Sequence, residues 1–216
     1  MGINRVSFFN TLYNEIQKRE NIKIHLNHEV NEEELNKFSE NSDLVIVCSG
    51  SKSLLSSSFE KKINKKYPFG CLWGMIPNEE ETINMLSQYV QSSKEMFGIL
   101  PSGKINNQRM LSVFWSVPIN DNINIKKEVE KISQYKKFLS ASLYEDIINM
   151  DFSIAEYKDI VMKTYHKNNI LLIGDIAHAM SPQLGQGANM ALLDSYLLYK
   201  LLSINKPNSV KDNLTI

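Results

Sequence analysis

A glycine and a carboxylate that directly follow a short apolar run are the strongest candidates for chemistry in this sequence of 216 residues. Residues 170–173 are all apolar, which is typical of a buried strand, and Gly174 and Asp175 come next. The missing side chain of Gly174 lets another group approach the backbone closely. Open α/β sheets bind ligands at the carboxyl ends of their strands, where Asp175 is expected to lie. A carboxylate at this place can accept hydrogen bonds from ribose-type hydroxyl groups.

The residues after Asp175 predict a tight loop that opens directly into a helix. Pro182, Gly185 and Gly187 shape the loop, and apolar residues then continue over 186–202. The free N–H groups and the positive dipole end of such a helix face any electron-rich ligand atom held there. Glycines that only make turns would explain a lone Gly-Asp pair, but the whole ordered string favours a ligand site.

The helix expected over 186–202 is almost entirely apolar. Asp194 and Lys200 are its only charged residues. A helix that is apolar on all sides is usually buried, so we predict that this one packs inside the protein.

The elements that position this string form a parallel α/β unit. An uninterrupted apolar strand at 44–48 is typical of a sheet that is covered on both faces. Apolar residues at helical spacing predict an amphipathic helix over 6–16, and alternation predicts a half-buried strand at 22–26. Asn31, followed by three glutamates, opens a further short helix.

The middle of the chain has a different character. Aromatic-rich segments at 69–77, 96–100 and 110–117 predict an antiparallel sheet, with a turn at 101–104 between two of its strands. Residues 125–150 predict a helix, and the chain returns to strands near 153–162 and at 170–173. Three aromatic side chains can either line a pocket or pack in a core: Tyr67, Trp73 and Trp115.

Composition excludes several classes of protein. The chain has 24 basic and 24 acidic residues, and this zero balance argues against a nucleic-acid binder. Cys48 and Cys71 are too few for a disulfide framework or a multi-cysteine zinc site, so we expect no metal and interpret both as small core residues in a reducing compartment. The N-terminus has no signal pattern and the apolar runs are too short for a bilayer, which predicts a cytoplasmic protein without a transmembrane segment.

The string from Gly174 to Asp194 resembles the second FAD-binding motif of flavin-dependent aromatic hydroxylases, the relatives of 4-hydroxybenzoate hydroxylase and of the ubiquinone-pathway hydroxylases. The resemblance extends over most of the chain. It includes four shorter segments: Asn4-Arg5, 67–73, 98–103 and 114–116.

The resemblance implies FAD as the cofactor and NAD(P)H as the co-substrate, with one oxygen atom of O₂ transferred to a small, aromatic substrate. It implies that Asp175 binds ribityl or ribose hydroxyl groups, and that the loop before residue 189 holds the pyrimidine end of the flavin. It assigns no catalytic residue. The expected cofactor-binding residues are Arg5, Gly174, Asp175, Pro182, Gly185, Gly187, Ala188 and Asn189.

The sequence departs from the family pattern at its glycines. No three of its nine glycines have the Gly-x-Gly-x-x-Gly spacing of the family's dinucleotide-binding loop, and Ser49-Gly50 stands where the family has Asp-Gly. The family also continues well beyond the last helix. A parallel sheet without its first strands exposes apolar edges, so we expect a partner chain or self-association to cover the sheet edge.

Together these observations predict an α/β fold (α+β overall), with an incomplete Rossmann-like parallel sheet and an inserted antiparallel substrate lobe. The FAD-binding domain is expected at 1–66 and 153–216, and the lobe with its helices at 67–152. The leading functional hypothesis is an FAD-dependent monooxygenase. The alternatives are a non-catalytic fragment or partner subunit of a split flavoprotein, and a flavin-dependent dehydrogenase or reductase.

Overall fold

The computed structural model describes residues 4–78, 83–91, 95–119, 123–182 and 185–204, and the chain divides into two compact units. Unit 1 comprises Met1–His25 and Pro68–Glu156, and unit 2 comprises Leu26–Tyr67 and Tyr157–Ile216. Both mix helices and strands, which confirms the predicted α/β class. The main difference from the predicted domains concerns residues 1–25. They are expected in the FAD-binding domain, whereas in the structure they belong to unit 1.

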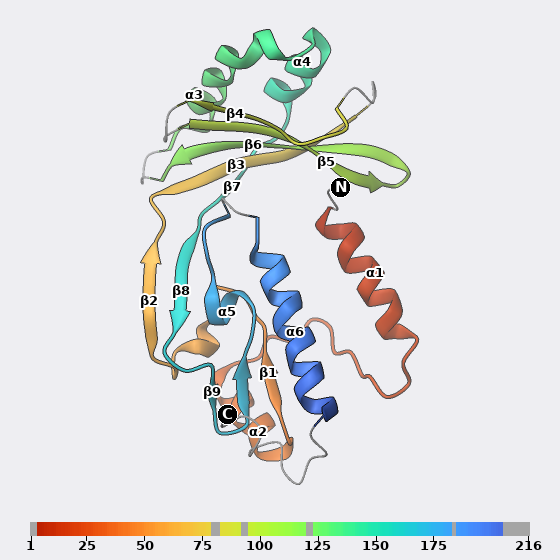
Figure 1. The fold of residues 1–216 in the computed structure, drawn as a ribbon, viewed down its shortest axis with the longest axis vertical. Coiled ribbons are helices and arrows are strands. Elements are labelled where there is room, and N and C mark those ends of the chain that lie inside the picture. Colours follow the sequence, from red (N-terminus) through yellow and green to blue (C-terminus); the bar gives the residue numbers. More distant parts are fainter. Residues whose placement is uncertain (1–3, 79–82, 92–94, 120–122, 183–184, 205–216) are drawn as a thin grey trace. The chain divides into compact units, whose positions relative to one another are not determined.

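Unit 1 is built on a five-stranded antiparallel sheet whose strands follow the order β4-β5-β6-β3-β7 (Figure 1). Strands β5 and β6 form a long hairpin, and β3 lies along the other side of β6. The antiparallel sheet expected from the aromatic segments is therefore confirmed. Its strands are β3 (Phe69–Pro77), β4 (Ser87–Gln91), β5 (Glu95–Ile105), β6 (Gln108–Pro118) and β7 (Ser153–Ala155).

Helices cover one face of this sheet and bury its aromatic core (Figure 1). Side chains alternate across each strand, so Trp115 points into the core and is 1% exposed. Trp73 lies on the opposite face and is 43% exposed. The covering elements are α3 (Ile125–Glu130), the 3₁₀ helix η2 (Lys131–Phe138) and α4 (Ala141–Asn149).

Two local features of unit 1 differ from the simplest expectation. The expected turn at 101–104 is instead a bulge inside β5, where the pairing register shifts and Gly103 adopts a φ of +78°. The helical register expected over 125–150 is confirmed but is divided among three elements, and the last begins where Ser140, with an extended backbone, caps a new helix by accepting a hydrogen bond from the Leu143 N–H at 3.2 Å.

The N-terminal helix α1 (Arg5–Gln17) confirms the predicted amphipathic helix, and its start is fixed to the β5 strand. The Asn4 side chain caps the helix and also donates to the carbonyl oxygens of Ser102 and Lys104, at 2.9 and 3.2 Å. These bonds explain why residues 1–25 group with unit 1.

Unit 2 contains the parallel pair of strands. Strand β1 (Val45–Val47) pairs in parallel with β10 (Ile170–Leu172), and the short β9 (His166–Lys167) pairs antiparallel with β10. A second antiparallel pair joins β2 (Lys61–Lys66) to β8 (Lys158–Met162). The remaining elements are α2 (Glu32–Asn41), the 3₁₀ helix η1 (Leu54–Ser56), α5 (Asp175–His178) and α6 (Gly187–Ile204).

The core of unit 2 lies on one side of its parallel strands. Val47, Ile170 and Leu172 are buried there against Leu35 of α2 and Ile176 of α5. On the other side Ile46 is 43% exposed, so the prediction of a strand covered on both faces is wrong within the described residues.

Two further predictions about the α/β unit are wrong. Residues 22–26 are all exposed and form no strand, because no described segment pairs with their backbone groups. The predicted helix at 186–202 is present as α6, but it is not packed inside the protein: Leu198 is its only buried residue. None of the described helices is both long and apolar enough to cross a bilayer.

Candidate functional site

The candidate site begins where β10 ends. The Ile173 N–H donates to the Val47 carbonyl oxygen at 3.1 Å, so parallel pairing continues one residue past the strand. Gly174 then adopts φ +69° and ψ −150°, a region that is essentially restricted to glycine. This turn sends the chain into α5 and leaves Asp175 exposed at its first position.

The Asp175 carboxylate lies close to the first residue of α6. Its Oδ1 atom is 3.7 Å from the position that a Cβ atom on Gly187 would occupy. Gly185 has a φ of +60°, and its N–H donates to the Pro182 carbonyl oxygen at 2.8 Å, which shapes the loop before the helix. Ala188 and Asn189 form the exposed first turn of α6.

The loop after α5 is anchored to strand β8. The Ile160 N–H donates to the Ala179 carbonyl oxygen at 2.8 Å. The Ser181 N–H donates to the Asp159 Oδ1 atom at 3.1 Å. These bonds hold the chain segment that leads from Asp175 toward α6.

This arrangement fits the ligand groups that a flavin nucleotide presents. An exposed carboxylate can accept hydrogen bonds from sugar or ribityl hydroxyl groups, and the first N–H groups of α6 have no partner inside their helix. Seven of the eight expected cofactor-binding residues lie on this one stretch of unit 2. The eighth, Arg5, is exposed at the start of α1 in unit 1.

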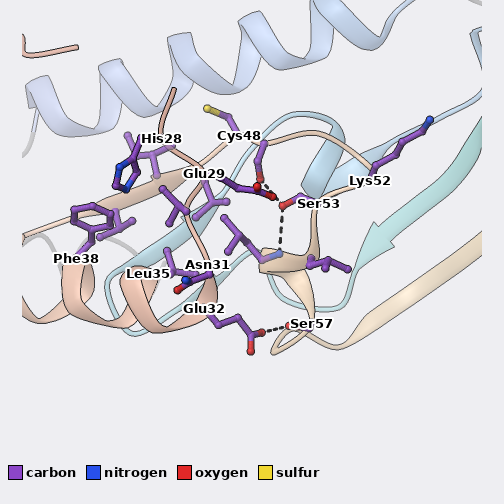
Figure 2. Close-up of a pocket in the computed structure, with 17 residues that line it drawn as sticks. His28, Glu29, Asn31, Glu32, Leu35, Phe38, Cys48, Lys52, Ser53 and Ser57 are labelled. Atoms are coloured by element: carbon purple, nitrogen blue, oxygen red, sulfur yellow. Dashed lines mark hydrogen bonds between the residues drawn. The ribbon is translucent and has the colours of Figure 1, made fainter. Parts of the chain in front are cut away.

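An open groove of about 1350 Å³ lies elsewhere in unit 2 (Figure 2). Its lining comes from β1, from the start of α2 and from the segment that follows β1. The lining combines apolar side chains such as Leu35 and Phe38 with the polar side chains of Ser49, Lys52 and Ser53. No pattern in the sequence predicts this groove.

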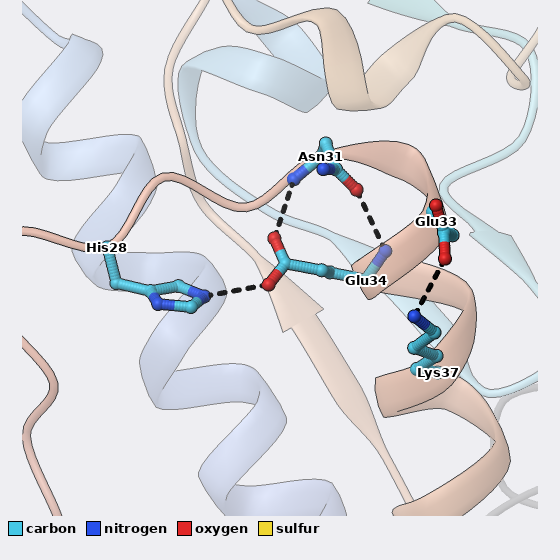
Figure 3. Close-up of polar contacts among 5 residues, drawn as sticks. All are labelled: His28, Asn31, Glu33, Glu34 and Lys37. Atoms are coloured by element: carbon cyan, nitrogen blue, oxygen red, sulfur yellow. Dashed lines mark hydrogen bonds and ion pairs between the residues drawn. The ribbon is translucent and has the colours of Figure 1, made fainter.

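A capping box fixes one wall of the groove (Figure 3). The Glu34 N–H donates to the Asn31 side chain at 2.9 Å, and the Glu34 carboxylate accepts the Asn31 N–H at 3.4 Å. The other Glu34 oxygen lies 3.1 Å from His28 Nε2. The predicted start of a helix at Asn31 is confirmed.

The segment after β1 forms the opposite wall. Ser49 donates from its hydroxyl to the Ser53 hydroxyl at 2.7 Å, and Gly50 makes the turn with a φ of +84°. Cys48 is exposed, so its prediction as a core residue is wrong. Its side chain belongs to the groove lining (Figure 2). Among the described residues, no three His, Cys, Asp or Glu side chains could together hold a metal ion.

The chain thus combines an α/β unit that contains a parallel pair of strands with an antiparallel sheet inserted between those two strands in the sequence. Residues 5–208 match the family model described as FAD binding domain, and the chain belongs to this family. The relationship expected from the string between Gly174 and Asp194 is thereby confirmed.

Several curated relatives from Penicillium species are FAD-dependent monooxygenases, and others carry different names. Kynurenine 3-monooxygenase of Drosophila willistoni is 26% identical over 229 aligned positions, which cover 93% of this chain and 50% of the relative. 2-Heptyl-3-hydroxy-4(1H)-quinolone synthase of Pseudomonas aeruginosa is 46% identical over 46 residues, covering 21% of this chain and 12% of the relative. The chain thus spans about half the length of kynurenine 3-monooxygenase and a smaller share of the quinolone synthase.

Solved structures share the fold at lower identity. 2-Methyl-3-hydroxypyridine-5-carboxylic acid oxygenase in its tetrameric form matches with a TM-score of 0.63 at 20% identity, over 81% of this chain and 48% of the other. HpxO of Klebsiella pneumoniae, in complex with FAD and uric acid, matches with a TM-score of 0.62 at 17% identity, over 80% and 45%.

The contacts that Asp194 makes beside this site were not expected from the sequence. Its Oδ2 atom accepts a hydrogen bond from the Gly174 N–H at 2.8 Å and lies 2.6 Å from His178 Nε2. One sequence feature points to these contacts: Asp194 is a carboxylate in a mostly apolar helix, and such a group needs a hydrogen-bonding partner when it is partly buried.

Proposed function

We propose that this chain forms the flavin-binding and substrate-lobe part of an FAD-dependent monooxygenase. The observation that supports it most is the exposed Asp175 carboxylate beside the exposed first turn of α6. When bound, FAD would supply the redox chemistry, with NAD(P)H as reductant and one oxygen atom of O₂ transferred to a small, aromatic substrate.

The residues of unit 2 bind and orient the cofactor in this proposal. Asp175 accepts hydrogen bonds from ribityl or ribose hydroxyl groups. Gly185 and Gly187 leave the backbone uncovered, so a ring can approach the N–H groups of Ala188 and Asn189. Arg5 of unit 1 is proposed as a further cofactor contact.

The test is a titration of the purified chain with FAD, followed by flavin fluorescence. We expect saturable quenching by the wild-type chain and a loss of affinity of about tenfold in Asp175→Asn, the scale of one hydrogen bond to a charged group. Asp43→Asn removes an exposed carboxylate elsewhere in unit 2 and serves as the matched control. Absence of quenching with the wild-type chain would overturn the proposal.

Oxidation of NADH or NADPH with added FAD tests the redox step separately. Monooxygenase activity requires an oxygenated product, whereas a dehydrogenase or reductase would oxidise the nicotinamide without one. Bound FAD without nicotinamide oxidation would indicate a binding module.

We also propose that another polypeptide, either a partner chain or a second copy of this chain, covers the free edge of β1. In the described residues β1 pairs only with β10, and an unpaired strand edge presents backbone N–H and C=O groups that another chain can pair with. A mass measurement by light scattering separates the two cases, and a monomeric chain with stoichiometric flavin would contradict both. A cytoplasmic location is proposed as well, and cell fractionation tests it.

A further inference from the structure

Asp194 is the one acidic residue of helix α6, and two hydrogen bonds converge on one of its oxygen atoms. The Oδ2 atom accepts from the Gly174 N–H at 2.8 Å and from His178 Nε2 at 2.6 Å. The side chains of His178 and Asp194 are only 18% and 19% exposed. Hydrogen bonds to a carboxylate are stronger than those between neutral groups.

We propose that Asp194 is a positioning residue for the flavin site, an inference that rests on the proposed function above. Gly174 precedes α5 and His178 is its last residue, so the two hydrogen bonds connect both ends of this short helix to Asp194. Asp175 lies between them. Asp194 is about two helical turns after the start of α6, so the same carboxylate fixes Asp175 relative to the first turn of that helix.

Other bonds show that this link is separable from the folding of the loop. The segment after α5 is held to β8 by the Ala179 carbonyl oxygen and by the Ser181 N–H, neither of which involves Asp194. The buried side chains of α5 pack in the core of unit 2. Loss of the Asp194 carboxylate therefore releases α6 from α5 while the strand and the loop keep their own contacts.

The experiment is a titration of the full chain with FAD, combined with amide hydrogen exchange of Gly174 in the ligand-free protein. The variants are Asp194→Ala, Asp194→Asn, His178→Ala and the double variant Asp194→Ala/His178→Ala. Ser195→Ala is the matched control, since the Ser195 hydroxyl bonds only within α6 in the described contacts, to the Ala191 carbonyl oxygen at 2.9 Å.

We expect the FAD dissociation constant of Asp194→Ala to rise about tenfold or more, the scale of losing charge-assisted hydrogen bonds. Gly174 exchange should accelerate in the same variant. Asp194→Asn keeps an oxygen acceptor and should recover part of both losses. His178→Ala should add little to Asp194→Ala, because both bonds end on the same oxygen. Ser195→Ala should match the wild type.

The outcomes separate this inference from the proposed function. If the wild-type chain binds FAD and Asp194→Ala binds it with the same affinity, the positioning role is wrong and the proposed function stands. Equal losses in Asp194→Asn and Asp194→Ala would also contradict positioning through the oxygen acceptor. If the wild-type chain does not bind FAD, both proposals fail. If Asp194→Ala does not fold, the FAD dissociation constants and the Gly174 exchange rates of Asp194→Asn and His178→Ala test the positioning role instead.

Discussion

The ring of Phe114 lies directly over Gly98 on the neighbouring strand of unit 1. The two residues are register partners across β5 and β6, and a Cβ atom placed on Gly98 would lie 2.0 Å from the Phe114 Cζ atom. Phe114 is also the register partner of Trp73 on β3. The glycine therefore makes room for an aromatic ring on the face of the sheet opposite the core helices.

Substitution of this glycine tests the ring placement. We expect Gly98→Ala to lower the free energy of unfolding by about 1–3 kcal/mol, because overpacking forces the ring out of its position. Chemical denaturation measures the loss. In a Phe114→Leu background the same substitution should cost less, since the clashing ring atoms are gone. Equal costs in the two backgrounds would contradict the contact.

The buried hydroxyl of Tyr135 predicts that Tyr135→Phe does not destabilise the protein at neutral pH. Tyr135 is 5% exposed, and its OH group has no hydrogen-bond partner among the described residues. An unsatisfied buried polar group costs about 1–3 kcal/mol, so its removal should leave stability unchanged or raised. Tyr144→Phe, at a partly exposed ring on α4, is the control. A clear loss of stability in Tyr135→Phe would indicate a partner for the hydroxyl.

The same tyrosine predicts a decline in stability at alkaline pH. Burial, assisted by the negative charge of Glu95, raises the pKa of Tyr135 above its usual value of 10.0. The unfolded chain thus releases this proton at lower pH than the folded protein. The contribution is full below pH 10.0 and is lost as the pH rises through the higher folded pKa. The decline across this window should be smaller in Tyr135→Phe than in the wild type, as measured by denaturation at each pH.

The capping box at Asn31 predicts how α2 responds to the loss of its N-cap. Asn31→Ala removes the acceptor for the Glu34 N–H and should cost about 0.5–2 kcal/mol. Lys37→Ala, which breaks an exposed ion pair with Glu33 on the same helix, should cost only about 0.2–0.5 kcal/mol. Denaturation of both variants gives the comparison. Equal losses would mean that the cap does not determine where the helix begins.

The sequence predicts elements whose signals are local. Asn31 caps a helix through its own side chain, and the string from Ile170 onward identifies a strand, a turn and a helix from neighbours in the chain. The predictions fail where the outcome depends on a distant partner. Residues 22–26 would form a strand only beside a neighbouring strand, and α6 would be buried only beneath other elements. Neither neighbour can be recognised from the local sequence pattern.

In the candidate site, too, the features that depend on neighbours in the chain were predicted and those that depend on distant residues were not. Gly174, Asp175 and Gly187 could be chosen from their order in the chain, and the structure places the Asp175 carboxylate beside Gly187. The bond between Asp194 and Gly174 spans a loop and a helix, so spacing alone does not reveal it. The groove beside β1 is equally hidden, because its walls come together only when α2 packs near the strand.

Substitution of Gly174 tests whether its backbone conformation is required for stability and for FAD binding. Its φ of +69° with ψ of −150° is a conformation that costs an L-residue of the order of 1–3 kcal/mol. Gly174→Ala should therefore lower the stability of the protein by about that amount and weaken FAD binding, because Asp175 follows directly. Denaturation and FAD titration measure the two effects.

A second variant separates backbone strain from crowding at this position. A Cβ atom on Gly174 would meet the Ala191 Cβ atom at 3.5 Å, an ordinary contact, so space is not the constraint. Ala191→Gly should consequently fail to rescue Gly174→Ala. If the double variant regained the stability expected from Ala191→Gly alone, packing against α6 would be what limits the residue at position 174. The claim that backbone strain requires glycine at the end of β10 would then be wrong.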